Sequence, residues 1–235
     1  MKILGIDSSG LVASVALVQD DILMAEYSVN YKKTHSQTLM PMLDEIIKMT
    51  DQDLSEINAI AVAAGPGSFT GLRIGSATAK GLGLALDKPI IAVPTCHALA
   101  YNLWGVDGLI CPIMDARRNQ VYTGIYEFAH GGLNVIRDQD AMDIHYLIDI
   151  LNGLGKSVTF TGDGVPVYED IIKTEMKTDF QFAPPHMNRQ RAGAVAALGK
   201  VYFMQGIMEP AGEHSPIYLR KSQAERERDE KLAGE

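Results

Sequence analysis

The chain carries the same order of predicted secondary structure twice, and this repeat constrains the fold more than any other feature. Residues 1–106 read as three strands followed by a helix, a strand, a helix, a strand and a helix. Residues 107–211 give the same order, although the two halves are barely alike in sequence. The repeat is therefore architectural. It predicts an α/β fold of two similar lobes, with mixed sheets, helices on both sides and a cleft between the lobes.

The last helix and the end of the chain are less constrained. Residues 191–206 predict an apolar helix that is free to pack back on the first lobe. Residues 212–235 follow as a C-terminal tail. From Pro216 onward the tail begins apolar and ends in mixed charge, which is typical of a frayed chain end.

Two aspartates occupy equivalent places in the two halves. Asp7 and Asp115 each end a first strand, at the tip of a predicted hairpin. Facing each other across the cleft, the two carboxylates can hold a Mg²⁺–nucleotide, as such hairpins do in actin-like ATPases, because Mg²⁺ prefers carboxylate and phosphate oxygens. In the alternative, each aspartate only caps its own turn. The sequence leaves both interpretations open.

A glycine turn follows the fourth strand in both halves, GPGSFTG in the first and TGDG in the second. Backbone N–H groups at a helix N-terminus attract anions, so a phosphate site is one interpretation. However, the loop lacks the GK[ST] of a Walker loop, and Thr70 stands where a dinucleotide fingerprint needs its third glycine. A purely structural turn is therefore favoured. The candidate residues of a residual nucleotide or phosphate cleft are Asp7, Ser8, Ser9, Gly65, Gly67, Thr70, Asp115, Arg117, Gly162 and Gly164.

The helix after the first glycine turn is poor in charge. Small residues recur at every fourth position, Gly71, Gly75, Ala79 and Gly83, although each interior glycine costs about 1 kcal/mol against alanine. A helix outside a sheet normally has a polar back, and this one has only one arginine and one lysine on a narrow edge. We therefore expect the small residues to face outward and to admit a second helix backbone. In the alternative, the glycines serve packing within the same chain.

The preceding helix extends this face, because Met42 and Met49 widen its apolar arc and methionine recurs on partner-binding surfaces. The helix pair predicts a dimerisation surface, either with a second copy or with another protein. Substituting Gly75 or Ala79 with arginine should then leave a folded monomer. The expected interface residues are Leu39, Met42, Leu43, Ile46, Met49, Gly71, Leu72, Gly75, Ala79, Leu82 and Gly83.

Composition narrows the classes of function. Lys and Arg number 21 against 29 Asp and Glu, so the net charge is −8, which argues against direct binding of nucleic acid. No two of the six histidines are four residues apart, so an HxxxH metal site is missing. Cys96 and Cys111 form no CxxC pair, and no apolar run is long enough for a secretory signal or a membrane span. We expect a reduced, cytoplasmic protein without a membrane partner.

Three stretches resemble one known family. IDSS near the start, INAIAVAAGPGSFTGLRIGSATAKGLGLALDKPIIAVPT in the middle and PIYLRKSQAE near the end are similar to the bacterial TsaB (YeaZ) family. The middle motif is highly specific, and the pattern covers most of the chain. The resemblance implies an actin-like, Hsp70-like fold of the ASKHA and ribonuclease H-like type. It also implies a cytoplasmic role in making threonylcarbamoyladenosine, the modified adenosine beside the anticodon of certain tRNAs.

The resemblance further implies a non-catalytic scaffold or activator subunit. Its partner would be the paralogue TsaD, which transfers the threonylcarbamoyl group and holds a metal through an HxxxH motif. Thr95 and Leu99 stand where the two imidazoles would be, so no metal site is expected in this chain. The ATPase TsaE would join the complex, tRNA would be contacted indirectly, and the isolated chain would form a homodimer. No cofactor would be held tightly, with ATP or ADP bound at most in the assembled complex.

Two rival functions remain as alternatives. The first is an actin-like ATP-binding phosphotransferase or ATPase that uses Asp7 and Asp115 in the cleft. The second is a metalloprotease, which the missing HxxxH disfavours strongly.

Overall fold

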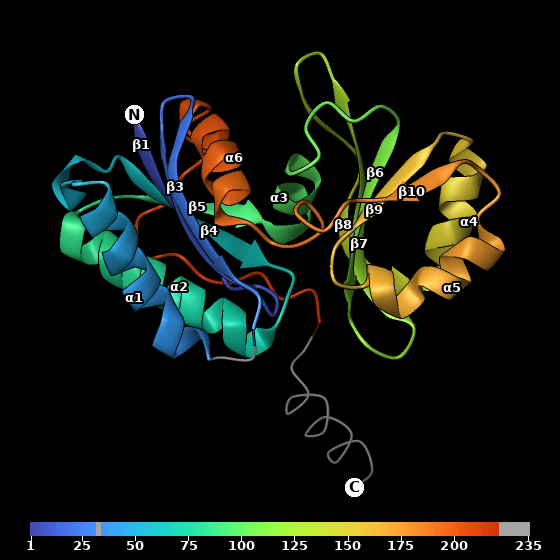
Figure 1. Cartoon of the computed structure of the whole chain (residues 1–235), viewed down its shortest axis with the longest axis horizontal. Helices are drawn as coiled ribbons and strands as arrows, with labels where there is room; N and C mark the ends of the chain where they lie inside the picture. The colour runs from blue at the N-terminus through green and yellow to red at the C-terminus, as the bar shows by residue number, and fades with distance from the viewer. Residues whose placement is uncertain (32–33, 221–235) are drawn as a thin grey trace, which may run out of the picture.

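The computed structural model describes residues 1–31 and 34–220, which fold into two lobes placed side by side along the longest axis (Figure 1). Each lobe is built around one five-stranded sheet. The first lobe contains β1 (Lys2–Asp7), β2 (Ala13–Gln19), β3 (Ile22–Val29), α1 (His35–Met49), the short 3₁₀ helix η1 (Leu54–Glu56), β4 (Ala59–Gly65), α2 (Phe69–Leu86), β5 (Ile90–Pro94) and α3 (Thr95–Tyr101). The second half contains β6 (Leu109–Asp115), β7 (Gln120–Ala129), β8 (Gly132–Asp143), α4 (Ile144–Leu154), β9 (Val158–Thr161), α5 (Val165–Glu175), β10 (Phe180–Phe182) and α6 (Ala192–Met204).

The two sheets have the same strand order. It is β3-β2-β1-β4-β5 in the first lobe and, read from the opposite edge, β8-β7-β6-β9-β10 in the second. In both, three antiparallel strands are followed by two that run parallel to the first strand. This topology confirms the predicted duplicated α/β fold with mixed sheets.

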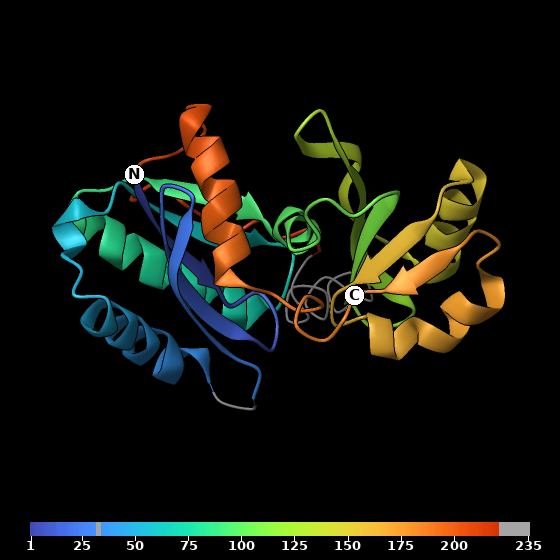
Figure 2. The same cartoon turned by 45° about the horizontal axis from the view of Figure 1, so that its top comes forward.

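Helices cover both faces of the first sheet, which explains why β1 and β4 read as nearly unbroken apolar runs. One face packs against α1 and α2, where Ile6 and Val62 share a core with Leu43. The other face packs against α6 (Figure 2), and Ile3 shares a core with Val195 there. The turns after β1 and β4 thus follow strands that are packed on both faces.

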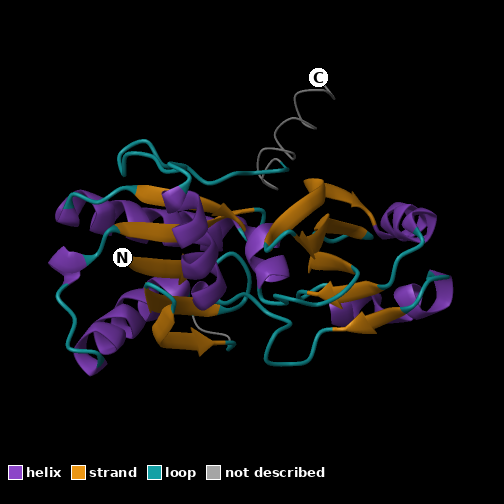
Figure 3. Cartoon of the chain, turned by 90° about the horizontal axis from the view of Figure 1, so that it is seen from above, coloured by secondary structure: helices purple, strands orange, loops and turns teal. Residues whose placement is uncertain are grey.

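The helices that end the two halves bind the lobes together. The last helix, α6, packs on β1, β2, β4 and β5 of the first lobe, whereas α3 packs against β6 and β7 of the second. Figure 3 shows helices between the two groups of strands as well as outside them. Cys96 and Ala100 of α3 share a buried core with Ile110 and Tyr126. We call this core, together with α3, the seam between the lobes.

The chain after α6 returns along the first lobe. Residues 209–220, which we call the strap, pair with β5 through the backbones of Ile90 and Glu209. Further on, the Ile217 N–H donates to the Ala64 carbonyl at the end of β4, at 2.7 Å. The expected frayed end is therefore wrong for residues 216–220, because hydrogen bonds to Ala64 and Ala116, which are distant in the sequence, hold them. The rest of the predicted tail, 221–235, lies outside the described residues.

Candidate functional site

A cleft of about 640 Å³ opens between the lobes, at the ends of β1, β4 and β6. Five of the ten candidate cleft residues line it: Ser9, Gly67, Thr70, Asp115 and Arg117. The other five lie outside its lining: Asp7, Ser8, Gly65, Gly162 and Gly164. Asp115 therefore lines the cleft and Asp7 does not. This placement disfavours the predicted arrangement in which the two carboxylates face each other around a nucleotide.

Asp7 is fully buried in the turn between β1 and β2. Its Oδ1 accepts hydrogen bonds from the Ser9 N–H at 2.9 Å and from the Ser9 hydroxyl at 2.7 Å. Its Oδ2 is buried without a hydrogen-bond partner in the described structure. Burial raises the pKa of Asp7 to about 6, although the bonds from Ser9 oppose this shift.

Asp115 is exposed at the equivalent turn of the second lobe. Its Oδ1 accepts from the Arg117 N–H at 2.8 Å and from the Tyr168 hydroxyl at 3.0 Å. Burial, with the bond to Asp115 second, raises the pKa of Tyr168 to about 12. Both aspartates thus accept from the backbone two residues on, which is the turn-capping role that the sequence left open.

The glycine turns are explained by close backbone contacts. Gly65 and Gly162 have φ angles of +123° and +105°, which side chains rarely adopt. A Cβ on Gly65 would overlap the Ile217 carbonyl oxygen, and one on Gly67 would overlap the Ser9 carbonyl oxygen. Ser68 caps α2 by accepting from the Gly71 N–H at 3.3 Å. These contacts support the structural interpretation of the loop.

Three further residues line the cleft that the sequence did not single out. Asp163 lies between the two glycines of the second turn, and its buried Oδ1 has no hydrogen-bond partner in the described structure. Burial raises the pKa of Asp163, although the positive charge of Arg189 opposes this shift. Its position between the two glycines of TGDG is a signal from which the sequence could have identified it as a cleft residue. His35 Nε2 lies 2.9 Å from the Gly10 carbonyl oxygen, and Tyr218 comes from the strap. No local pattern marks His35, whereas Tyr218 lies in the PIYLRKSQAE stretch, which carried the family resemblance but no prediction of a cleft residue.

The row of small residues on α2 faces inward, so its expected outward orientation is wrong. A Cβ on Gly71 would overlap the Ser8 carbonyl oxygen, and one on Gly75 would overlap the Ser8 hydroxyl. Ala79 is fully buried in the first-lobe core, and a Cβ on Gly83 would lie 2.7 Å from the Ala211 Cβ. The glycines therefore serve packing within the chain, which was the alternative. Arginine at position 75 or 79 should disrupt the fold rather than leave a folded monomer.

Most of the other expected interface residues also belong to the core of the first lobe. The buried ones are Leu39, Met42, Leu43, Ile46 and Leu72, and Leu82 packs against them partly buried. Only Met49 is well exposed, at 75% of its surface. Met42 is buried because α1 presents it, beside Leu43, to the sheet.

The solvent-exposed side of α2 is formed by other residues, which lie on the side of the helix away from the small-residue row. The exposed residues are Thr70, Arg73, Ala77, Gly81, Leu84 and Ala85. Arg73 is the single charged residue among them, and Leu84 exposes 65% of its surface. Among the described residues, nothing lies within 4 Å of a Cβ added to Gly81, so the space around it is open there. The neighbouring helix α1 exposes Met40 and Met49 together with the charged Asp44, Glu45 and Lys48, and we call the exposed residues of the two helices the outer face.

The described residues also bear on two further kinds of site, a metal centre and a membrane-spanning helix. No group of three His, Cys, Asp or Glu side chains among residues 1–31 and 34–220 is arranged to hold a metal ion. Thr95 and Leu99 lie one turn apart on α3, and both are buried. Within the same residues, no helix has the length and apolar character needed to cross a membrane.

Comparison with known proteins gives the family. Residues 23–228 match the family model described as TsaD: tRNA N6-adenosine threonylcarbamoyltransferase. The fold resembles YeaZ from Pseudomonas aeruginosa, with a TM-score of 0.77 and 23% identity over 93% of this chain and 99% of that one. It also resembles an inorganic polyphosphate/ATP-glucomannokinase from Arthrobacter, with a TM-score of 0.50 and 11% identity over 87% of this chain and 99% of that one. These likenesses identify the fold as the two-lobe ASKHA type.

The sequence relatives are more specific. The tRNA threonylcarbamoyladenosine biosynthesis protein TsaB of Bacillus subtilis is 38% identical over 228 residues, which is 96% of each chain. Because this likeness spans nearly the whole of both proteins, it applies to both lobes and to the strap. The chain therefore belongs to the TsaB family of tRNA threonylcarbamoyladenosine biosynthesis proteins.

Proposed function

We propose that this chain is a non-catalytic subunit that binds a TsaD-type threonylcarbamoyltransferase through the outer face of α1 and α2. The observation that carries the proposal is the α2 side of this face, which exposes Leu84 and has Arg73 as the single charged residue among its exposed positions. An exposed helix side with large apolar side chains and little charge is typical of an interaction site. Gly81, between Ala77 and Ala85, lets a partner backbone approach closely.

The chemistry of the cleft supports a non-catalytic role. Asp7, the carboxylate that the rival phosphotransferase would need beside a metal–nucleotide, is buried and bonded to Ser9. Asp115 is engaged by its own turn and by Tyr168. We therefore favour the partner subunit over an ATP-dependent enzyme, and we propose that the isolated chain holds no nucleotide tightly. Binding energy at the outer face would then stabilise the competent conformation of the transferase.

Other members of the assembly follow from the same proposal. The ATPase TsaE would join the pair, and tRNA would be contacted mainly by the other subunits, in keeping with the net charge of −8. In isolation, the outer face would be covered by a second copy of this chain. Sedimentation of the isolated chain then detects a homodimer that the transferase displaces.

The experiment replaces Gly81 with arginine, since the space around it is open and the substitution can be made without disturbing the core. The variant should fold normally and lose affinity for a purified TsaD-family transferase by at least about 30-fold, as expected at the centre of an interface. Transfer of the threonylcarbamoyl group by the mixture should fall in parallel. Affinity is measured by isothermal titration calorimetry and transfer by tRNA nucleoside analysis.

Gly153 provides the matched control. It lies in α4 of the second lobe, is exposed and has nothing within 4 Å of an added Cβ, so Gly153→Arg adds the same charge to a helix away from the outer face. This variant should bind the transferase as the parent does. Unchanged affinity in Gly81→Arg, or equal loss in both variants, contradicts the proposal. Full transfer activity despite lost association contradicts the activator role alone.

A further inference from the structure

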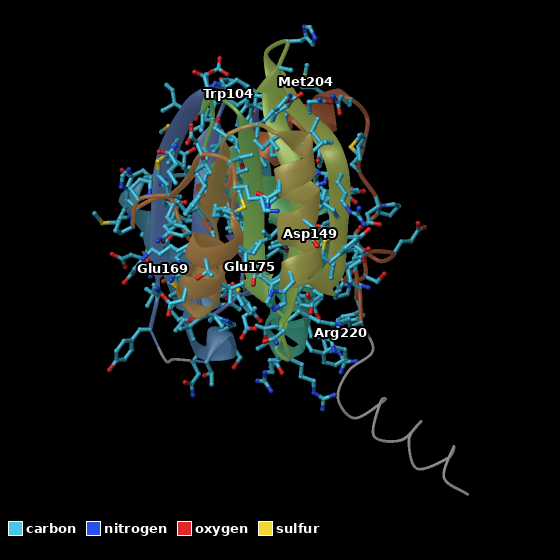
Figure 4. All side chains as sticks on the ribbon, turned by 90° about the vertical axis from the view of Figure 1, so that its right-hand side faces the viewer. Trp104, Asp149, Glu169, Glu175, Met204 and Arg220 are labelled. Carbon is cyan, nitrogen blue, oxygen red and sulfur yellow. The ribbon has the colours of Figure 1, made fainter. Side chains whose placement is uncertain are left out.

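The strap connects the two lobes on the side of the cleft. It leaves α6, runs beside β5 and α2 of the first lobe, and reaches the turn between β6 and β7 of the second. Its last described residue, Arg220, lies at the lower end of the molecule in Figure 4, away from Trp104 and Met204. There its Nη1 donates to the Ala116 carbonyl oxygen at 2.8 Å. The strap thus spans the cleft mouth.

The near half of the strap is fixed in the first lobe. Ala211 and His214 are buried, and Ala211 fits against α2 only because position 83 has no side chain. The Lys80 ammonium donates to the His214 carbonyl oxygen at 2.9 Å. The His214 Nδ1 lies 2.6 Å from Glu209 Oε1, within the strap itself. Burial and hydrogen bonding together make this half an integral part of the lobe.

In the far half, residues 216–220, the Ile217 N–H is bonded to the Ala64 carbonyl, and the contacts beyond it are made by side chains that are more exposed. Ile217 and Tyr218 expose 41% and 40% of their surfaces. The Tyr218 ring packs on Phe69 with centroids 4.6 Å apart, and its hydroxyl accepts from Arg73 Nε at 3.3 Å. Exposed contacts of this kind open at much lower free energy than a buried core does. The strap therefore changes from a fixed to a releasable segment after Ile217.

The turn that Arg220 contacts is strained. Arg117, Arg118 and Asn119 have φ angles of 63°, 58° and 58°, three successive residues in the left-handed region that non-glycine residues disfavour. Strain of this kind persists only where the surroundings hold it in place. Arg220 supplies one such contact from the other lobe, directly beside these three residues.

We propose that residues 218–220 are a latch that holds the cleft mouth closed. With Arg220 bonded to Ala116, the second-lobe turn is fastened to the start of α2 through Tyr218 and Phe69. When the latch is released, the lobes swing apart about the seam, whose buried core remains intact, and the cleft widens. This inference concerns the conformation of the isolated chain and does not depend on the proposed transferase partner.

The test measures the distance between the lobes by electron paramagnetic resonance. Spin labels are placed at Gln37→Cys in α1 and Asp170→Cys in α5, both exposed sites. The native Cys96 and Cys111 are fully buried, and burial raises the pKa of Cys111 to about 12, so they should remain unlabelled. Arg220→Ala should lengthen the mean distance and broaden its distribution. Arg220→Lys, which retains a donor for Ala116, should restore much of the parent distribution.

Two further variants keep the result interpretable. Arg118→Ala removes a positive charge from the same turn without removing the strap contact, and it should leave the distance unchanged. Tyr218→Ala removes the packing on Phe69 and should act in the same direction as Arg220→Ala. The latch is refuted if Arg220→Ala and Tyr218→Ala both keep the parent distribution, or if Arg118→Ala shifts it as much as they do. Circular dichroism of each variant confirms that the fold is retained.

Discussion

The two lobes share a strand order but differ at the turn after their first strands. In the first lobe, α6 covers the sheet and Asp7 is sealed inside, where its side chain accepts hydrogen bonds from Ser9. In the second, the equivalent Asp115 is exposed and held by Tyr168 from α5. A duplicated topology therefore does not produce duplicated chemistry, because burial by helices from elsewhere in the chain decides what each carboxylate can do.

The largest effect should come from the packing that seals the Asp7 turn. Gly75→Leu places a side chain where the Ser8 hydroxyl lies, so we expect a loss of at least about 4 kcal/mol in unfolding free energy. Gly81→Ala in the same helix should instead add about 0.5–1 kcal/mol, because its Cβ enters open space. Urea denaturation measures both. Similar unfolding free energies for the two variants would contradict tight packing of α2 against the first-lobe turn.

The next effect is a pH dependence belonging to Asp7. Its pKa is about 6 in the folded chain against the usual 3.8, so the folded state favours the protonated carboxyl. The resulting stabilisation is complete below about pH 4 and is lost as the pH rises to about 6, by up to about 3 kcal/mol. Asp7→Asn should abolish this fall in stability, whereas Asp115→Asn should retain it. Urea midpoints measured between pH 4 and pH 8 distinguish the contributions of the two aspartates. The same pH dependence of the midpoint in both variants would contradict the difference in burial between Asp7 and Asp115.

Removing the hydroxyl that serves Asp7 should have a smaller effect. Ser9→Ala deletes the 2.7 Å hydrogen bond to a buried carboxylate, which is worth about 2 kcal/mol when the carboxylate is charged. The loss of unfolding free energy should be greater at pH 8 than at pH 4, because a protonated Asp7 accepts a weaker hydrogen bond than the charged carboxylate does. A loss independent of pH would assign the effect to packing rather than to the carboxylate.

The smallest effect belongs to the second-lobe turn. Tyr168→Phe deletes hydrogen bonds to Asp115 at 3.0 Å and to the Gln120 carbonyl oxygen at 3.2 Å, and should cost about 1 kcal/mol. Solvent can replace the bond to the exposed Asp115, so the loss should stay below that of Ser9→Ala at pH 8. Thermal denaturation at that pH compares the two variants directly. A larger loss of stability in Tyr168→Phe than in Ser9→Ala would mean that the second-lobe turn depends more on Tyr168 than the first-lobe turn depends on Ser9.

Local patterns were sufficient for the fold and for part of the cleft. The element order predicted both sheets, and the positions of Asp7 and Asp115 predicted equivalent turns, because turn capping is set by residues two apart. The spacing on α2 revealed a small-residue row but not its direction. A helical wheel relates residues to one another, whereas the Ser8 turn and Ala211 that fill this row come from distant parts of the chain.

The same limit applies to the outer face and to the strap. Ala77, Gly81 and Ala85 have the same spacing as the buried row, so periodicity alone offers two candidate faces and cannot choose between them. Residues 216–220 were recognised as apolar, but their partners Ala64, Phe69 and Ala116 are more than a hundred residues away in sequence. Contacts at such separation follow from the assembled lobes and not from any local signal.

The placement of α6 on the first lobe has a consequence for synthesis on the ribosome. The apolar face formed by Ile3, Ala61 and Val93 is complete once β5 has been made, yet its cover, Val195 and Leu198, is translated about a hundred codons later. Until then, the nascent first half must carry an open hydrophobic surface. The N-terminal lobe therefore acquires its final stability only when nearly the whole polypeptide has emerged.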